Sequence, residues 1–226
     1  MSVSEIYFLH IGKCAGSKIK ALSGRLPASE IVIKALPHKV KLRQLSPHLR
    51  YFFSIRDPLT RFKSGFYSRK RKGRPTYNSE WTPFEAAAFS KFEDANDLAE
   101  NLFRSDNRGR SAMDAIQSIE HTSMQQIDWF EGTGVFSVRP PIWIVRQENF
   151  ADDFQELMRR CGIHPIPRTL SEGLVERVHA NEYPHVSEFT DLATSNLRKW
   201  YARDFAFYEQ CTEWMKEQLD RKFIEG

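Results

Sequence analysis

Two short segments in the first third of the chain place basic and hydroxyl side chains at the end of an apolar run. Residues 6–18 read Ile-Tyr-Phe-Leu-His-Ile-Gly-Lys-Cys-Ala-Gly-Ser-Lys. Residues 51–67 read Tyr-Phe-Phe-Ser-Ile-Arg-Asp-Pro-Leu-Thr-Arg-Phe-Lys-Ser-Gly-Phe-Tyr. Each is typical of a strand that runs into a turn and then a helix, and a helix N-terminus favours anions. Two such units side by side predict a site for one ligand with two separate phosphate groups.

The first turn, 12–18, offers the groups that bind a phosphate. Gly12 and Gly16 allow close approach of the backbone, and Lys13, Ser17 and Lys18 can add charge and hydrogen bonds. The pattern departs from the G-x-x-x-x-G-K-[ST] loop of ATP and GTP hydrolases, because only three residues separate the two glycines and the lysine follows the serine. The alternative interpretation is an ordinary strand–helix turn.

The second segment is more specific. Arg56 follows the strand and offers a planar fork for two hydrogen bonds to one phosphate. Ser64 follows eight residues later on the predicted helix, and Arg61 is a second fork on that helix. The basic run at 69–74 is expected to form a solvated helix face for the most part.

The two segments together resemble those of sulfotransferases that use 3′-phosphoadenosine 5′-phosphosulfate, most closely the branch with heparan sulfate 2-O-sulfotransferase and its bacterial relatives. That family has His-Ile-Pro-Lys-x-Gly-Gly-Thr where this chain has His-Ile-Gly-Lys-Cys-Ala-Gly-Ser at 10–17. The family's Arg-Asp-Pro-x-x-Arg-x-x-Ser-x-x-Tyr is matched in full at 56–67. Gly12 replaces the common Pro, and Cys14-Ala15 replaces Thr-Gly. A weaker likeness covers 144–154 and 200–208.

The resemblance implies transfer of a sulfuryl group from this donor to a hydroxyl or amine acceptor by in-line displacement, without a metal. Adenosine 3′,5′-bisphosphate is then the product, and Lys13 is expected to stabilise the charge that grows on it. The resemblance assigns the 3′-phosphate to Arg56 and Ser64. The loop residues expected to contact the 5′ end of the donor are Lys13, Cys14, Ala15, Gly16, Ser17 and Lys18.

A hydroxyl acceptor needs a general base. The resemblance implies a histidine between the two phosphate motifs, and His38 occupies that place. A surface histidine in a Pro-His turn is the alternative interpretation. His10 is expected to pack or to support the loop, His48 to be exposed, and His121 with Gln125 is a further candidate for the acceptor cleft.

Apolar runs at 5–11, 31–36, 51–55 and 142–145 predict four strands. Helices are predicted over 17–25, 58–71 and 149–161, and two helices or one bent helix over 187–221, with irregular chain over 132–141 and 163–186. Asp57-Pro58 is typical of a helix start, and Thr82 with Glu85 predicts a capping box at another. Residues 94–131 are predicted to be helical with interruptions. Alternating strands and helices imply an α/β fold, with a mainly parallel sheet flanked by helices on both faces. The resemblance makes this the P-loop-kinase-like fold of the sulfotransferases. We expect one domain over 1–226, with a helical insertion at about 75–135.

Composition and charge narrow the protein class. With 41% hydrophobic residues the chain can bury a core, and no apolar run is long enough to cross a bilayer. The N-terminus does not resemble a signal peptide, so a cytoplasmic protein is expected. Three distant cysteines argue against a disulfide framework, although a nucleophilic Cys14 has to be considered. Residues 1–74 carry 17 Lys and Arg against three acidic residues, which favours an anionic ligand.

Two other functions stay open at this point. A phosphate-loop kinase for a small metabolite would use ATP and magnesium, and a non-catalytic nucleic-acid-binding module would use the basic half of the chain. We favour the sulfotransferase, with a small-molecule or glycan acceptor and no nucleic-acid partner. The acceptor's identity and the oligomeric state do not follow from the sequence.

Overall fold

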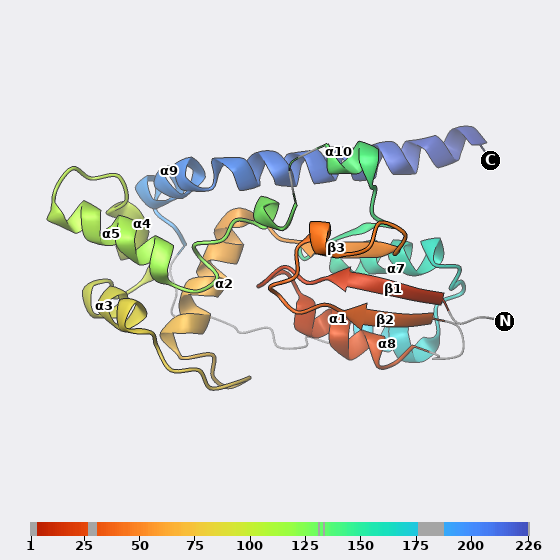
Figure 1. Ribbon diagram of the computed structural model, residues 1–226, viewed down its shortest axis with the longest axis horizontal. Helices are drawn as coiled ribbons and strands as arrows, with labels where there is room; N and C mark the ends of the chain where they lie inside the picture. The colour runs from red at the N-terminus through yellow and green to blue at the C-terminus, as the bar shows by residue number, and fades with distance from the viewer. Residues whose placement is uncertain (1–3, 27–30, 131, 133, 176–187, 226) are drawn as a thin grey trace. The chain divides into compact units, whose positions relative to one another are not determined.

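The computed structural model describes residues 4–26, 31–130, 132, 134–175 and 188–225, which fall into two compact units (Figure 1). The first unit comprises 1–56, 126–182 and 206–226, and the second comprises 57–125 and 183–205. Each has its own hydrophobic core. The sequence predicted one domain with an insertion at about 75–135, whereas the second unit begins at 57 and includes a later segment as well.

The first unit contains a parallel sheet of four strands in the order β2-β1-β3-β4. β1 (Ser4–Leu9) lies between β2 (Ile31–Ala35) and β3 (Tyr51–Ile55), and β4 (Ile144–Arg146) pairs with β3. All four predicted strands are present, so the α/β class and the parallel sheet are confirmed.

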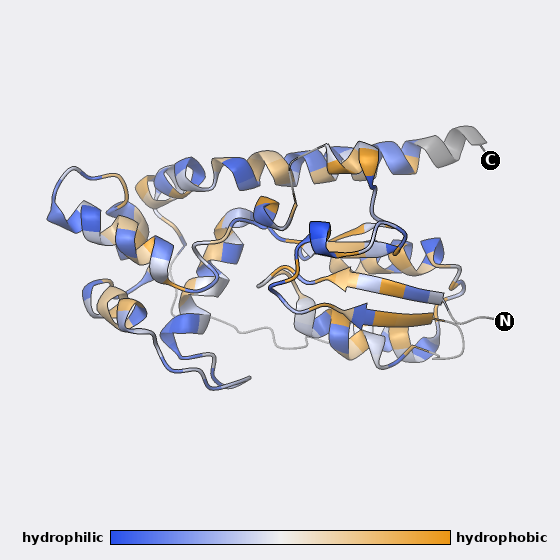
Figure 2. Cartoon of the chain, in the orientation of Figure 1, coloured by the Kyte–Doolittle hydropathy of each residue, from blue (hydrophilic) through white to orange (hydrophobic). Residues whose placement is uncertain are grey.

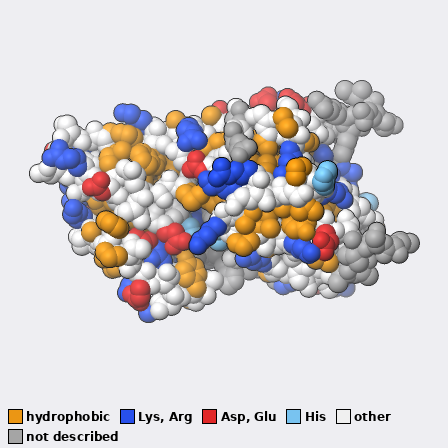
Figure 3. All heavy atoms as spheres, in the orientation of Figure 1, with side chains coloured by type: hydrophobic (Ala, Val, Ile, Leu, Met, Phe, Trp, Pro, Cys, Tyr) orange, Lys and Arg blue, Asp and Glu red, His pale blue; other side chains and the backbone are white. Residues whose placement is uncertain are grey.

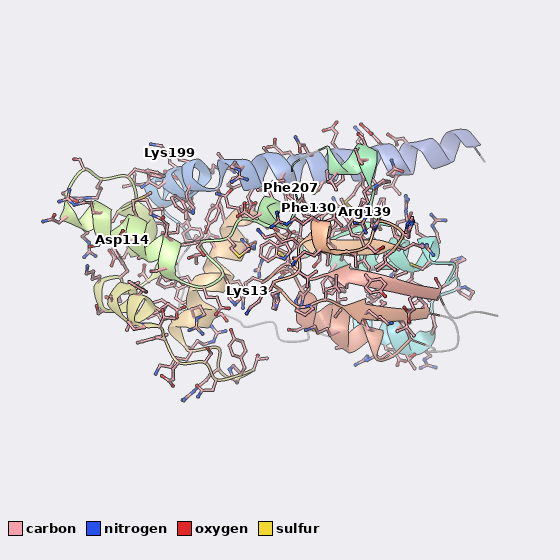
Figure 4. The ribbon with its side chains drawn as sticks, viewed as in Figure 1. Lys13, Asp114, Phe130, Arg139, Lys199 and Phe207 are labelled. Carbon is pink, nitrogen blue, oxygen red and sulfur yellow. The ribbon has the colours of Figure 1, made fainter. Side chains whose placement is uncertain are left out.

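Aromatic side chains on β3 fill both faces of the sheet. All five residues of β3 are buried, and neighbours along a strand point to opposite faces. Phe52 stacks on Phe8 with ring centroids 5.1 Å apart. On the other face, Phe53 packs against Phe130 at 4.7 Å and Phe207 of α10 (Ala202–Glu225) at 6.2 Å (Figure 4). The sheet is therefore covered on both sides at β3.

Helices and short helical turns complete the first unit. They are η1 (Leu42–Gln44), η2 (Gln126–Trp129), α1 (Gly16–Ser23), α6 (Val135–Val138), α7 (Phe150–Arg160), α8 (Arg168–Val175) and most of α10. α1 contacts β2 and α8, and α7 contacts β4 and α8. Along α10, hydrophilic and hydrophobic residues alternate, as expected for a helix with one buried face (Figure 2).

Two stretches predicted to be irregular contain helices. α6 lies within 132–141 and α8 lies within 163–186, so the prediction is wrong at both places. In α8, the buried Leu170 and Leu174 lie one turn apart, and Pro167 precedes the helix and accepts hydrogen bonds from its first turn. The prolines of this stretch favour irregular chain, but proline is also common at helix starts. Residues 176–187 of the second stretch lie outside the described residues.

The second unit is helical. Its helices are α2 (Pro58–Lys70), α3 (Pro83–Lys91), α4 (Ala95–Glu100), α5 (Asn107–Ser118), α9 (Asp191–Trp200) and the first turn of α10. Two predicted helix starts are confirmed. Asp57 caps α2 by accepting from Thr60 N at 2.9 Å, and Thr82 and Glu85 form a reciprocal capping box on α3.

Arg69 departs from the solvated basic face predicted for 69–74. It is 1% exposed and binds the Glu85 carboxylate through two nitrogens, at 2.7 and 2.8 Å. Burial raises the pKa of Glu85, but the hydrogen bonds from Arg69, Thr82 N and Glu120 N and the charge of Arg69 outweigh it and lower the pKa to about 2. Arg69 is therefore a structural residue of the second unit.

Arg61 is also buried, at 2% exposure, and donates to the carbonyl of Met124 at 2.9 Å. It pairs with the buried Asp204 at 3.8 Å within the second unit.

On the face drawn in Figure 3, acidic side chains interrupt the basic ones. Over the part of the chain that the structure describes, no helix combines the length and the apolar character needed to cross a bilayer.

Candidate functional site

The two predicted phosphate segments follow neighbouring strands. The chain leaves β1 toward β2 and returns on the other side of β1 to form β3. In open α/β sheets, ligands bind where the strand order reverses in this way, at the carboxyl ends of the strands. Lys13 lies beyond the end of β1 (Figure 4), and Arg56 directly follows β3 in the sequence. The topology thus brings Lys13 and Arg56 to the expected edge of the first unit.

The turn after β1 has an unusual backbone. Lys13 and Ala15 have positive φ angles of 67° and 61°, and residues other than glycine adopt such angles at a cost of about 1–2 kcal/mol. Such strain is concentrated at functional sites. Ala15 precedes α1 and makes no side-chain cap, and the first turn of α1 has no acidic residue. The turn therefore leaves this helix N-terminus without a capping carboxylate or hydroxyl from the N-cap position, as an anion site requires.

Cys14 holds the turn from inside the protein. Its side chain is fully buried, and its thiol lies 3.2 Å from Oε1 of Gln126 and 3.5 Å from the carbonyl of Gly12. Its own carbonyl accepts a hydrogen bond from the hydroxyl of Ser54 in β3. These contacts favour a structural role for Cys14 over a nucleophilic one.

Gln126 connects the two turns, and the sequence reasoning missed it. Its Oε1 accepts from Arg56 N at 2.9 Å and its Nε2 donates to the Arg56 carbonyl at 2.8 Å, while the same Oε1 contacts Cys14. The guanidinium of Arg56 also donates to the carbonyl of Lys13 at 3.4 Å. Nothing local marks Gln126, because it lies 70 residues beyond Arg56 in a stretch predicted as part of a helix.

The remaining predicted phosphate ligands are dispersed. Ser17 is exposed in the first turn of α1. Lys18 donates to the carbonyl of Leu174 at 2.8 Å, and its ammonium lies 4.7 Å from the centroid of the Phe150 ring. Ser64 is half-buried on α2 and belongs to the second unit, whereas Arg56 belongs to the first.

His38 is exposed in the turn after β2, and the fold orients its ring. Nδ1 lies 3.1 Å from the carbonyl oxygen of His10. A carbonyl only accepts, so Nδ1 carries the proton and the lone pair of the neutral ring is at Nε2, as a general base requires. The carbonyl of His38 accepts from Nε1 of Trp129 at 3.0 Å, which fixes the turn a second time.

The other histidine candidates fall elsewhere. His48 is exposed and precedes the amino end of β3, as predicted. In the second unit, a Cβ added at Gly65 would lie 3.2 Å from Cβ of His121, so His121 packs against α2. Gln125 donates to the carbonyl of Trp200 at 3.2 Å. His10, at 5% exposure, packs in the first unit as expected.

Among the described residues, no group of three or more His, Cys, Asp and Glu side chains is arranged to hold a metal ion. No protein-family model matches this chain, and comparison with curated proteins and with solved structures gives no match.

Proposed function

We propose that the protein is a sulfotransferase that moves a sulfuryl group from 3′-phosphoadenosine 5′-phosphosulfate to an acceptor hydroxyl. One observation carries the proposal: the phosphate turn after β1 and Arg56 after β3 lie together at the strand-order reversal, and Gln126 joins them. This arrangement suits a ligand with two phosphate groups, and the full sequence match at 56–67 favours this donor.

The two turns have different tasks in this proposal. The N–H groups at the start of α1, the hydroxyl of Ser17 and the ammonium of Lys13 bind the 5′ end of the donor. The guanidinium of Arg56 binds the 3′-phosphate, to which the sequence resemblance at 56–67 also assigns Ser64. The ammonium of Lys18 donates to the carbonyl of Leu174, so Lys18 adds positive charge near the 5′ end of the donor rather than binding it directly.

In the transfer step, the acceptor oxygen forms a bond to sulfur while the bond from sulfur to the bridging oxygen of the 5′-phosphate breaks. The acceptor proton passes to Nε2 of His38, and the electron pair of the broken bond stays on adenosine 3′,5′-bisphosphate. Lys13 stabilises that growing charge, a contribution of about 3–4 kcal/mol where a single such donor is removed from an enzyme. Because charge rises on the leaving oxygen and Lys13 is already positive, the step needs no metal.

Ligand-induced thermal stabilisation separates this function from its alternatives. A ligand that binds only the folded protein raises the melting temperature by mass action. We expect a shift with adenosine 3′,5′-bisphosphate and little shift with ATP–magnesium or a short oligonucleotide. A shift with ATP–magnesium alone would favour a kinase, and a shift with the oligonucleotide alone, lost at high salt, would favour a nucleic-acid-binding module.

The base assignment has its own test. His38→Ala should reduce transfer about 100-fold or more while bisphosphate binding stays intact. His48→Ala removes an exposed histidine of the same unit and serves as the matched control. Near-full transfer by His38→Ala would show that another group takes the proton.

A further inference from the structure

His10 directly follows β1 and lies against three parts of the candidate site. Its side chain is 5% exposed. Its ring stacks on Phe8, with centroids 5.0 Å apart and planes at 29°, so the core of the sheet supports it. On its other side, the His38 ring lies 3.8 Å away, centroid to centroid, at 40°.

The same imidazole leaves no room for a side chain at position 16 of the phosphate turn. A Cβ built on Gly16 would overlap the His10 ring, since even the Cε1 atom would be only 2.7 Å away. Real Cβ atoms do not approach other heavy atoms so closely, and a buried ring that is stacked on Phe8 cannot move aside easily. Gly16 is therefore required by the His10 ring as well as by any phosphate that approaches the backbone.

The main chain of His10 adds a third contact. Its carbonyl oxygen lies 3.1 Å from Nδ1 of His38, which sets the tautomer of His38. One residue thus touches the start of α1 with its ring, and touches His38 with both its ring and its carbonyl.

We propose that His10 is a positioning residue that fixes His38 relative to the phosphate turn. This inference rests on the proposed function, in which the turn holds the donor and His38 takes the acceptor proton. The carbonyl sets which nitrogen of His38 carries the proton, and the ring sets where the His38 ring lies. His10 contributes to the reaction through His38 and Gly16.

Removal of the ring should lower the rate and leave donor binding in place. A 1 Å misplacement of a reacting group can cost about 100-fold in rate. We expect His10→Ala to reduce the transfer rate about 10- to 100-fold, with bisphosphate affinity within about threefold of wild type. His10→Gln, whose amide can reach the position of Nε2, should recover part of the rate, and His48→Ala should have no effect.

A spectroscopic readout does not depend on transfer. In spectra of ¹⁵N-labelled imidazoles above the protonation range, wild-type His38 should show a proton on Nδ1. His10→Ala retains the carbonyl but loses the ring that holds the His38 ring beside it, so the hydrogen bond of Nδ1 should loosen and His38 should then populate both tautomers. An unchanged tautomer together with an unchanged rate would overturn the proposal. If wild type does not bind the bisphosphate, the proposed function fails, while the tautomer measurement still reports on His10.

A double-mutant cycle tests the ring against the turn. Gly16→Ala should lower the melting temperature by about 4–8 °C, as expected for overpacking in a chain of this size. In the His10→Ala background the added methyl has room, and the same change should cost less than about 2 °C. Gly24→Ala is the matched control, because its Cβ would meet no atom closer than 3.6 Å. An equal loss in both backgrounds would contradict the contact.

Discussion

Replacing Gln126 by Leu removes the amide that joins the two turns and leaves a branched apolar side chain that is one atom shorter. Gln126 is fully buried. The change deletes the acceptor of the Arg56 N–H, at 2.9 Å, the donor to the Arg56 carbonyl, at 2.8 Å, and the partner of the Cys14 thiol, at 3.2 Å. We expect the first unit to lose stability and the spacing of the turns to become less fixed.

The magnitude follows from the groups that lose their partner. A buried backbone donor or acceptor left unpaired costs about 1–3 kcal/mol, so the two groups of Arg56 together cost about 2–6 kcal/mol. The thiol is a weak donor and adds little. The additional apolar area of Leu offsets about 1 kcal/mol. The free energy of unfolding should therefore fall by about 1–5 kcal/mol in Gln126→Leu.

Urea unfolding followed by tryptophan fluorescence measures this loss, since Trp129, Trp143 and Trp214 all belong to the first unit. Gln155→Leu is the control, because Gln155 is exposed on α7 of the same unit. A loss below about 0.5 kcal/mol in Gln126→Leu, the range of ordinary surface substitutions, would refute the role given to this amide. The bisphosphate affinity of the variant should fall as well.

Three further predictions concern stability and reactivity. Glu85→Gln should cost about 3 kcal/mol by leaving the buried Arg69 without its carboxylate. The pKa of Glu85 is about 2 against an ordinary 4.5, so its stabilisation is present above pH 4.5 and lost as the pH falls toward 2. Urea unfolding should therefore show wild type to be more stable than Glu85→Gln at pH 7 but not at pH 2. Thr82→Ala should cost about 1 kcal/mol through loss of the α3 cap, measured in the same way; no loss would contradict the capping box. Cys14 and Cys211 are fully buried, so iodoacetamide should modify them only in urea, and rapid native labelling seen by mass spectrometry would contradict their burial.

Much of the fold could be predicted because its signals are local. The apolar run at 51–55, the Asp57-Pro58 helix start and the Thr82–Glu85 capping box each depend on a few consecutive residues, and all three are present. The motif positions Lys13 and Arg56 could be predicted for the same reason. The sheet order then brings them together, as expected for parallel strands that alternate with helices.

The remaining features depend on long-range packing. Gln126 meets Arg56 across 70 residues, and the Arg69–Glu85 pair joins two helices, so neither has a signature in a short window. Lys18 resembles a phosphate ligand in the sequence, but its ammonium binds the carbonyl of Leu174, 156 residues away. The two-unit division is also non-local, since it groups 57–125 with 183–205.

The central claim is that two separate phosphate groups are held at two separate turns. Calorimetric titration of adenosine 3′,5′-bisphosphate and of adenosine 5′-monophosphate tests it directly, in wild type and in Arg56→Met, which keeps the aliphatic stem. A hydrogen bond to a charged group is worth about 1.5–3 kcal/mol, so wild type should prefer the bisphosphate by about 10- to 100-fold. Arg56→Met should lose that preference and bind the monophosphate as wild type does. Equal affinity of wild type for both nucleotides, or an equal loss for both in Arg56→Met, would contradict the claim.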